Sequence, residues 1–189
     1  MSGTRSRKPA VRAFATEVEQ AEHQYKEDPD DDRSPNLALL PTGREVNRVF
    51  IVGTLTEKDD VGSDNEYWHA RVVDPTGTYN VYAGQYQPDA AQLIRETDTP
   101  EYVALTAKVT RFELDDGGYN VTLRPENMTV TDQATRDRWL IETARDTIDR
   151  IEAFEDSEQA TEASKKAVEQ YDPDMDYVRR DVRDALNTI

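Results

Sequence analysis

The central part of the chain has the apolar and polar pattern of β-strands. Residues 49–55 are apolar and largely β-branched, and a polar stretch, residues 57–66, follows them as an expected loop. Asp74-Pro75-Thr76-Gly77 is a strong turn signal, so the segments on either side of it should form a hairpin. The pattern predicts strands over residues 49–55, 67–73, 79–83, 101–112 and 119–124, and a short helix over residues 88–96.

The order of these elements predicts the fold. Three strands, a short helix and two more strands form the element order of the five-stranded OB barrel, and an SH3-like or Sm-like barrel would lack the helix. Gly53, inside the first strand, is expected at a sharp bend of the kind that a small barrel needs. We therefore predict a mainly β fold with helical flanks: a five-stranded OB-fold barrel plus an N-terminal helix and C-terminal helices.

Helical periodicity is found on both sides of the barrel. Residues 9–27 start with a proline suited to a first helical turn and carry an apolar stripe, which predicts a helix that ends at the acidic run 28–32. We divide the chain into an N-terminal helix and acidic linker (residues 1–43), the OB barrel (44–131) and a C-terminal helical region for subunit association (132–189).

The C-terminal region begins with a heptad-like apolar stripe, which predicts an amphipathic helix. Weaker stripes within residues 160–171 and 175–189 predict two more helices. These helices are too short for a large core of their own, so they should pack on the barrel, on one another or on a partner. The candidate partner-binding residues of the first stripe are Trp139, Leu140, Ile141, Ala144, Ile148, Ile151 and Phe154.

Acidic residues dominate the composition. The 189 residues include 39 Asp and Glu against 23 Lys and Arg, for a net charge of −16. Such numbers fit either a disordered acidic chain or a folded protein with the acidic surface of a halophile, and the periodic segments favour the second. At about 1 M salt the Debye length is only ~3 Å, so distant carboxylates would hardly repel a nucleic acid. Affinity would then come from close contacts, chiefly aromatic stacking.

The chain offers little for catalysis. It has no cysteine and only two histidines, His23 and His69, so no thiolate or histidine-rich metal site is predicted, and no cofactor. The glycines at 77 and 117–118 lie in turns and not before helices, and no activated serine or cysteine accompanies His69, which is interpreted as an ordinary strand residue. No apolar run follows the polar N-terminus. We expect a cytoplasmic protein that is not an enzyme and does not contact a membrane.

The aromatic residues of the barrel point to a binding face. In OB barrels the ligand face lies on the second and third strands, and exposed rings there stack on bases. A period of two places Tyr67, His69 and Arg71 on the outer side of the second strand and Trp68 on the core side. The candidate nucleic-acid-binding residues are Tyr67, Arg71, Tyr82, Lys108, Arg111, Phe112, Tyr119 and Arg124. Against this reading, residues 44–130 hold 8 basic and 15 acidic residues, a net of −7.

Three strings of the sequence carry a family resemblance. Residues 40–57 (LPTGREVNRVFIVGTLTE), 67–78 (YWHARVVDPTGT) and 82–88 (YAGQYQP) resemble the haloarchaeal replication protein A-associated proteins, and the likeness covers about residues 9–155. That family looks like a relative of the middle subunit of replication protein A, an OB barrel followed by an amphipathic helix. The resemblance implies a complex with the large subunit of replication protein A on single-stranded DNA.

The resemblance also implies roles for individual residues. In the middle subunit, a phenylalanine at the end of the fourth strand stacks on DNA, and Arg111-Phe112 matches that position. Tyr82 is the nearest match to a second stacking aromatic, and residues 139–154 match the helix that joins a bundle with the partners. The acidic residues Asp59, Asp60, Asp115 and Asp116 depart from a basic DNA groove.

These observations predict a non-catalytic subunit of a replication protein A-type single-stranded-DNA-binding complex that acts in DNA replication and repair. One alternative is an OB-fold adaptor that binds the large subunit without contacting nucleic acid. A second alternative is an RNA-binding OB protein of translation, which would prefer RNA over DNA of the same sequence.

Overall fold

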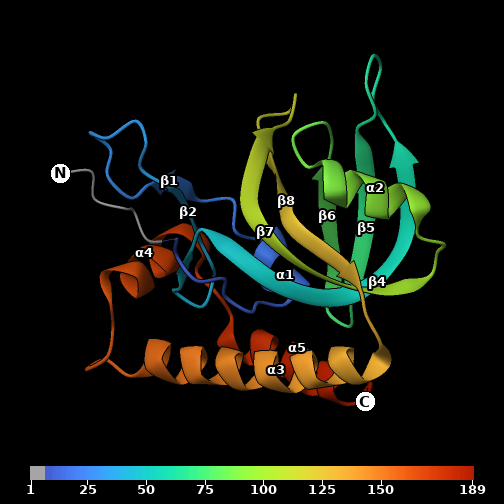
Figure 1. Cartoon of the computed structure of the whole chain (residues 1–189). Coiled ribbons are helices and arrows are strands. Elements are labelled where there is room, and N and C mark those ends of the chain that lie inside the picture. Colours follow the sequence, from blue (N-terminus) through green and yellow to red (C-terminus); the bar gives the residue numbers. More distant parts are fainter. Residues whose placement is uncertain (1–6) are drawn as a thin grey trace.

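The central strands close into a barrel in the computed structural model, which describes residues 7–189. Neighbouring strands follow the order β4-β5-β6-β8-β7, and β7 pairs again with β4. All pairs are antiparallel except β6 with β8. This is the OB topology, so the predicted fold class is confirmed (Figure 1). The strands are β4 (Arg48–Asp60), β5 (Trp68–Asp74), β6 (Gly77–Ala83), β7 (Glu101–Glu113) and β8 (Tyr119–Val130).

The barrel interior is apolar, and β4 comes so close to β5 at one point that a glycine is needed there. Ile51, Leu55, Val72 and Leu123 are fully buried inside it. A Cβ atom on Gly53 would lie 2.5 Å from the backbone oxygen of Val73, so no other residue fits at this position. Helix α2 (Pro88–Glu96) is the helix predicted between the third and fourth strands. It packs on β5, β6 and β8.

Two strands are longer than their sequence pattern predicts. Strand β4 continues through the polar residues 57–60, where Asp60 pairs with Trp68, so the connecting loop covers only residues 61–67. Strand β8 continues to Val130 because it stays paired with β7. Cross-strand pairing here outweighs the polar composition that indicated a loop.

The predicted helix over residues 9–27 is wrong for most of its length. Only α1 (Ala15–Glu19) is helical. Before it, the chain is extended beside β4: Val11 donates its N–H to the Arg48 carbonyl and accepts one from Phe50, both at 3.0 Å. The apolar side chains of Phe14, Ala15, Val18 and Ala21 are buried as a helix would bury them, but pairing with β4 decides the backbone.

A small second sheet, which was not predicted, precedes the barrel in the chain. Strands β1 (Gln24–Lys26), β2 (Asn36–Leu39) and β3 (Glu45–Val46) form it, antiparallel throughout. It lies beside the barrel at the N-terminal end of β4 (Figure 1). The sequence signal for this sheet was the apolar run at residues 37–40, which was missed. Its side chains Leu37, Leu39 and Leu40 are buried.

The three helices predicted in the C-terminal region are present. Helix α3 (Gln133–Glu155) runs along the underside of the barrel, α5 (Met175–Leu186) packs on α3, and α4 (Glu162–Tyr171) lies between them in sequence (Figure 1). A buried ion pair joins α3 to α1, because Arg150 contacts Glu17 at 2.7 Å and Glu17 also accepts a hydrogen bond from Thr42. None of the helices within residues 7–189 combines the length and apolarity that a membrane span requires.

Candidate nucleic-acid interface

The outer face of β5 and β6 carries the aromatic candidate site. Ala70, Val72 and Val81 point into the barrel, so their neighbours His69, Arg71, Asn80 and Tyr82 point outward. The register places His69 opposite Tyr82 and Arg71 opposite Asn80. The period of two therefore predicted the outward side correctly, and Trp68, on the other side, packs half-buried against the core.

Three rings on this face stack on one another. The Tyr82 ring lies between His69, at a centroid distance of 4.6 Å and an interplanar angle of 13°, and Tyr67, at 5.6 Å and 27°. The His69 Nε2 lies 3.0 Å from the Asn80 Oδ1, which fixes the imidazole plane. Partial burial raises the pKa of Tyr82 and Tyr67 adds to the rise, so the phenol stays neutral near neutral pH. Tyr67 is 45% exposed, so the stack reaches the surface of the protein.

The position of Tyr67 is set by its neighbours. The Asp60 Oδ1 accepts the backbone N–H groups of Tyr67 and Gly62, each at 3.0 Å, and these bonds lower the pKa of Asp60. The Tyr67 ring covers Gly84 so closely that a Cβ there would lie 2.7 Å from its Cδ2. Asp60, which seemed to oppose a nucleic acid, is therefore used to hold the loop that carries Tyr67.

Tyr86 enlarges the aromatic face and was not predicted. Its side chain is 84% exposed, and with Tyr67 it borders a hollow of about 440 Å³ between the loop 61–67 and residues 84–87. The sequence signal was present, since Tyr86 follows the third strand closely, but an isolated tyrosine in a loop has no periodicity to indicate its direction.

The face continues from the rings onto β8 and β7. Val81 pairs with Leu123, both buried, so the outward Tyr82 is followed across the sheet by Arg124. Arg124 pairs in turn with Lys108. Phe112, 44% exposed, is on the same side of β7 near the tip of the β7–β8 hairpin. Tyr67, Arg71, Tyr82, Lys108, Phe112 and Arg124 thus share the outer face.

Two candidate residues point to the other side of that hairpin. Arg111 and Tyr119 alternate with Phe112 and Asn120, and the Arg111 guanidinium lies 4.1 Å from the centre of the Tyr119 ring. Arg111 also donates a hydrogen bond to the Glu22 carbonyl of the N-terminal segment. The structure therefore separates these two side chains from the Tyr67–Tyr82–His69 stack.

The predicted partner-binding stripe of α3 lies inside the chain. Trp139 is 2% exposed, donates its indole N–H to the Phe50 carbonyl at 3.0 Å and meets the Phe14 ring edge-on at 5.7 Å. Ile151 packs with Met175 and Val178 of α5. The remaining residues follow the same pattern: Leu140 and Ala144 are buried, Ile148 and Phe154 are partly buried, and only Ile141 is exposed.

This arrangement corrects the placement of the stripe, because the sequence does not say which surface covers an apolar face. The barrel, the N-terminal segment and α5 cover it in this chain.

Concerning other chemistry, residues 7–189 contain no cluster of three or more His, Asp or Glu side chains suited to a metal ion.

Comparisons with known proteins find similarity at the level of the barrel. No protein-family model and no curated protein matches the chain. Among solved structures, the mitochondrial single-stranded DNA binding protein Rim1 from S. cerevisiae is 22% identical, over 46% of this chain and 94% of that chain, with a TM-score of 0.36. OBody AM3L09 bound to hen egg-white lysozyme is 13% identical, over 66% of this chain and 98% of that chain, with a TM-score of 0.43. OBody AM1L10 bound to hen egg-white lysozyme is 14% identical, over 68% and 100%, with a TM-score of 0.42. Likeness of this degree concerns the fold alone and assigns no ligand.

Proposed function

We propose that this chain is a non-catalytic protein that binds single-stranded DNA on the outer face of β5 and β6. The observation that carries the proposal is the stack of Tyr67, Tyr82 and His69, which lies at the surface and leads directly to Arg124 and Lys108. Stacking requires unpaired bases, and each base on an aromatic ring is worth about 1–3 kcal/mol. A single strand fits this face better than a duplex for that reason.

The acidic surface does not exclude such binding. Glu57, a carboxylate beside this face, is paired with Arg71 at 3.2 Å, so its negative charge is already neutralised. Stacking depends little on ionic strength, whereas the repulsion between a distant carboxylate and a phosphate is screened by salt. We expect affinity that survives at molar salt.

Fluorescence anisotropy with labelled oligo-dT, at low and molar salt, tests the proposal. Tyr82→Ala should weaken binding about tenfold or more, corresponding to about 1–3 kcal/mol per stacked base, and Tyr82→Phe should restore it. Tyr177→Ala, which removes an exposed tyrosine on α5, is the matched control and should change nothing. Equal affinities of wild type and Tyr82→Ala would refute the role of the rings. An oligo-rU of the same length decides between DNA and RNA.

The finer proposal is a subunit role in a replication protein A-type complex, in replication and repair. It rests on the resemblance of residues 40–57, 67–78 and 82–88. Since the α3 stripe is covered, the partner should bind this chain without displacing α3. Co-expression with the large subunit of replication protein A should give one complex on size exclusion, and separate elution would refute this part alone.

The adaptor alternative is favoured by the local net charge of −7 over residues 44–130. It predicts that the chain joins the large subunit while neither oligo-dT nor oligo-rU binds to it at either salt concentration. The same anisotropy and co-elution measurements therefore decide between the two.

A further inference from the structure

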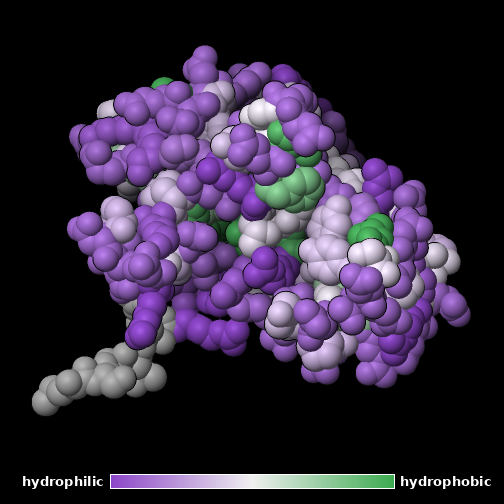
Figure 2. All heavy atoms as spheres, turned by 90° about the horizontal axis from the view of Figure 1, so that it is seen from above, coloured by the Kyte–Doolittle hydropathy of each residue, from purple (hydrophilic) through white to green (hydrophobic). Residues whose placement is uncertain are grey.

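A basic groove lies next to the aromatic face, and it is made partly of the N-terminal segment. Three hollows of about 320, 470 and 550 Å³ border one another around Arg124, which lines all three. Strands β7 and β8 form the floor, with Lys108, Thr110 and Arg124. Residues of β1 and β2 form one wall, and residues 86–90 form the other. Seen from above, the surface is mainly hydrophilic and is hollowed between the N-terminal part and the barrel (Figure 2).

The charge of the groove is opposite to the charge of the chain. Its lining holds 8 of the 23 basic residues but only 3 of the 39 acidic ones. Concentrating like charges costs free energy unless an anion is nearby. The basic residues are Arg7, Lys8, Lys26, Arg33, Arg48, Lys108, Arg111 and Arg124, and the acidic ones are Glu27, Asp89 and Glu126.

Internal ion pairs neutralise only part of this charge. Glu126 faces two guanidinium groups, from Arg48 at 2.8 Å and Arg7 at 2.9 Å, and these contacts lower its pKa. Lys8 is paired with Glu27, and Lys26 is paired with Asp32 at 3.1 Å. Lys108 and Arg124, on the floor, have no carboxylate within ion-pairing distance among residues 7–189.

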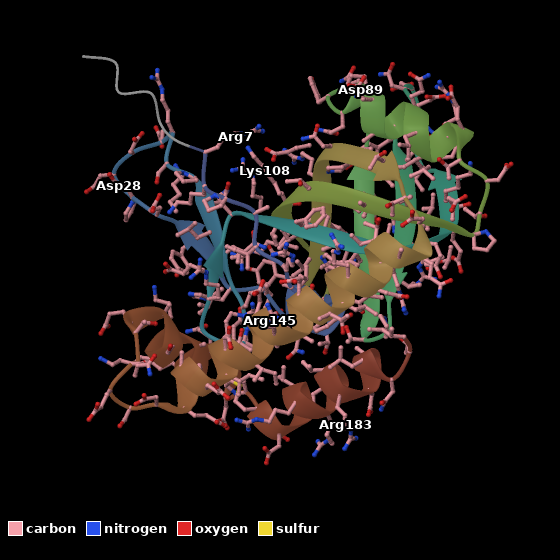
Figure 3. All side chains as sticks on the ribbon, turned by 60° about the horizontal axis from the view of Figure 1, so that its bottom comes forward. Arg7, Asp28, Asp89, Lys108, Arg145 and Arg183 are labelled. Atoms are coloured by element: carbon pink, nitrogen blue, oxygen red, sulfur yellow. The ribbon has the colours of Figure 1, made fainter. Side chains whose placement is uncertain are left out.

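The N-terminal wall is already in place and does not need a ligand to form. Arg48 donates to the Lys8 carbonyl at 2.7 Å, and Arg111 binds the Glu22 carbonyl. Val11 is paired with β4, as described above. Figure 3 shows Arg7 and Lys108 in the space between the N-terminal strands and the barrel, and both line the same hollow. A five-stranded barrel alone would lack Arg7, Lys8, Lys26 and Arg33.

We propose that this groove binds the phosphate backbone of the single strand whose bases stack on the rings of the aromatic face. The inference rests on the proposed function and extends it: the N-terminal segment supplies half of a polyanion-binding channel that the barrel lacks. Continuity carries the argument, since Arg124 follows Tyr82 across the sheet and also lines all three hollows. A phosphodiester chain that leaves the ring stack toward β7 therefore meets Arg124 and Lys108 first, and then Arg7 and Lys8 of the N-terminal wall.

The salt dependence of binding tests the groove separately from the rings. Each phosphate contact on a single strand contributes about −0.7 to the slope of log affinity against log salt. Lys108→Gln with Arg124→Gln should make this slope for oligo-dT less steep by about 1.4. Arg7→Gln with Lys8→Gln should reduce it as well, because the N-terminal wall takes part. Tyr82→Ala should lower affinity and leave the slope unchanged.

Arg145→Gln with Arg183→Gln is the matched control. It removes two exposed positive charges from α3 and α5, away from the groove (Figure 3), and should leave the slope as in wild type. A slope that is the same in wild type and in Lys108→Gln with Arg124→Gln overturns the proposal. The double variant Lys108→Gln with Arg124→Gln is called the floor variant below. If the slope changes in the floor variant but not in Arg7→Gln with Lys8→Gln, the N-terminal segment does not contribute to the site.

An abasic oligodeoxynucleotide separates failure of the groove from failure of the ring face. This probe has phosphates without bases, so wild type and Tyr82→Ala should bind it equally, and the floor variant should bind it at least about tenfold less tightly. Wild type and Tyr82→Ala could bind oligo-dT equally while the floor variant still binds the abasic chain more weakly than wild type. That result would refute the proposed ring face and support the groove. Equal binding of the abasic chain by wild type and floor variant, or tighter binding of a polyglutamate peptide of equal charge, overturns the groove as a backbone site.

Discussion

The outer face of β5–β6 and the barrel-facing side of α3 differ in how they use aromatic side chains. Both carry aromatic side chains, and both were predicted to be binding surfaces, one for nucleic acid and one for a partner protein. On α3, Trp139 is packed against Phe14 and hydrogen-bonded to the Phe50 carbonyl. On β5–β6, Tyr82 and His69 stack beside Tyr67, which is 45% exposed, at the surface. The pattern of a segment shows which side is apolar, and the fold determines whether that side becomes core or surface.

The largest effect should come from breaking the buried side of this comparison. Trp139→Ala removes a fully packed indole and its hydrogen bond, so the free energy of unfolding should fall by about 3–5 kcal/mol. Thermal and urea unfolding measure this loss. Ile141→Ala, on the exposed side of the same helix, should change the stability by about 0.5 kcal/mol or less. Similar losses for the two variants would mean that α3 does not pack on the barrel as described.

Breaking the ion pair between Arg150 of α3 and Glu17 of α1 should lower the free energy of unfolding nearly as much. Arg150→Met leaves the Glu17 carboxylate buried without its cation, which should cost about 3–5 kcal/mol of unfolding free energy. Adding Glu17→Gln removes the isolated charge and should recover much of the loss. Urea unfolding of the two single variants and the double variant gives the coupling energy. Simple additivity of the single losses would contradict a direct contact.

On the exposed side, Gly84→Ala should weaken DNA binding more than it affects folding. The added methyl group would displace the Tyr67 ring, which lies 2.7 Å from the Cβ position. We expect a loss of affinity close to that of Tyr67→Ala, about 1 to 2 kcal/mol, measured by anisotropy with oligo-dT. Since both changes act through one ring, the double variant should bind no more weakly than Tyr67→Ala. Independent losses would show that Gly84 does not position Tyr67.

The smallest effect concerns Glu126, where the N-terminal segment meets the barrel. The contacts with Arg48 and Arg7 lower its folded pKa below the unfolded value. The stability that it contributes is therefore complete above the ordinary glutamate pKa and is lost as the pH falls through the lowered folded value. The unfolding free energy of wild type should exceed that of Glu126→Gln by about 1 kcal/mol or less at neutral pH, and the difference should disappear in acid. Unfolding free energies at several pH values check this, and a constant difference would contradict it.

Much of the barrel could be predicted because its signals are local. The Asp74–Gly77 turn formed the predicted hairpin between β5 and β6, and residues 88–96 formed the predicted helix. Gly53 lies at a close strand approach, as a glycine within a strand indicated. Alternation along β5 also placed Tyr67, His69 and Arg71 on one side. It did not reveal that His69 and Tyr82 are stacked, because that depends on the register between two strands.

The failures share one physical cause. An apolar stripe such as that of residues 9–27 is compatible with a helix, but pairing of Val11 with β4 satisfies the backbone and buries the same side chains in another way. Arg111 and Tyr119 were grouped with Phe112 because all three lie beside the last predicted hairpin, whereas alternation along that hairpin turns them to the opposite face. Contacts between distant segments decide such cases, and a single segment does not contain them.

The sequence by itself determined the strands, the helix between the third and fourth of them, and the excess of acidic charge, since these follow from residue type and local spacing. Only the tertiary structure decided that the α3 stripe is covered, that Tyr82 lies between two rings, and that basic residues from both ends of the barrel sequence and from the N-terminal segment line one groove. Packing brings together residues that are more than a hundred positions apart in the sequence, such as Arg7 and Glu126. The periodicity of a single segment does not predict such contacts.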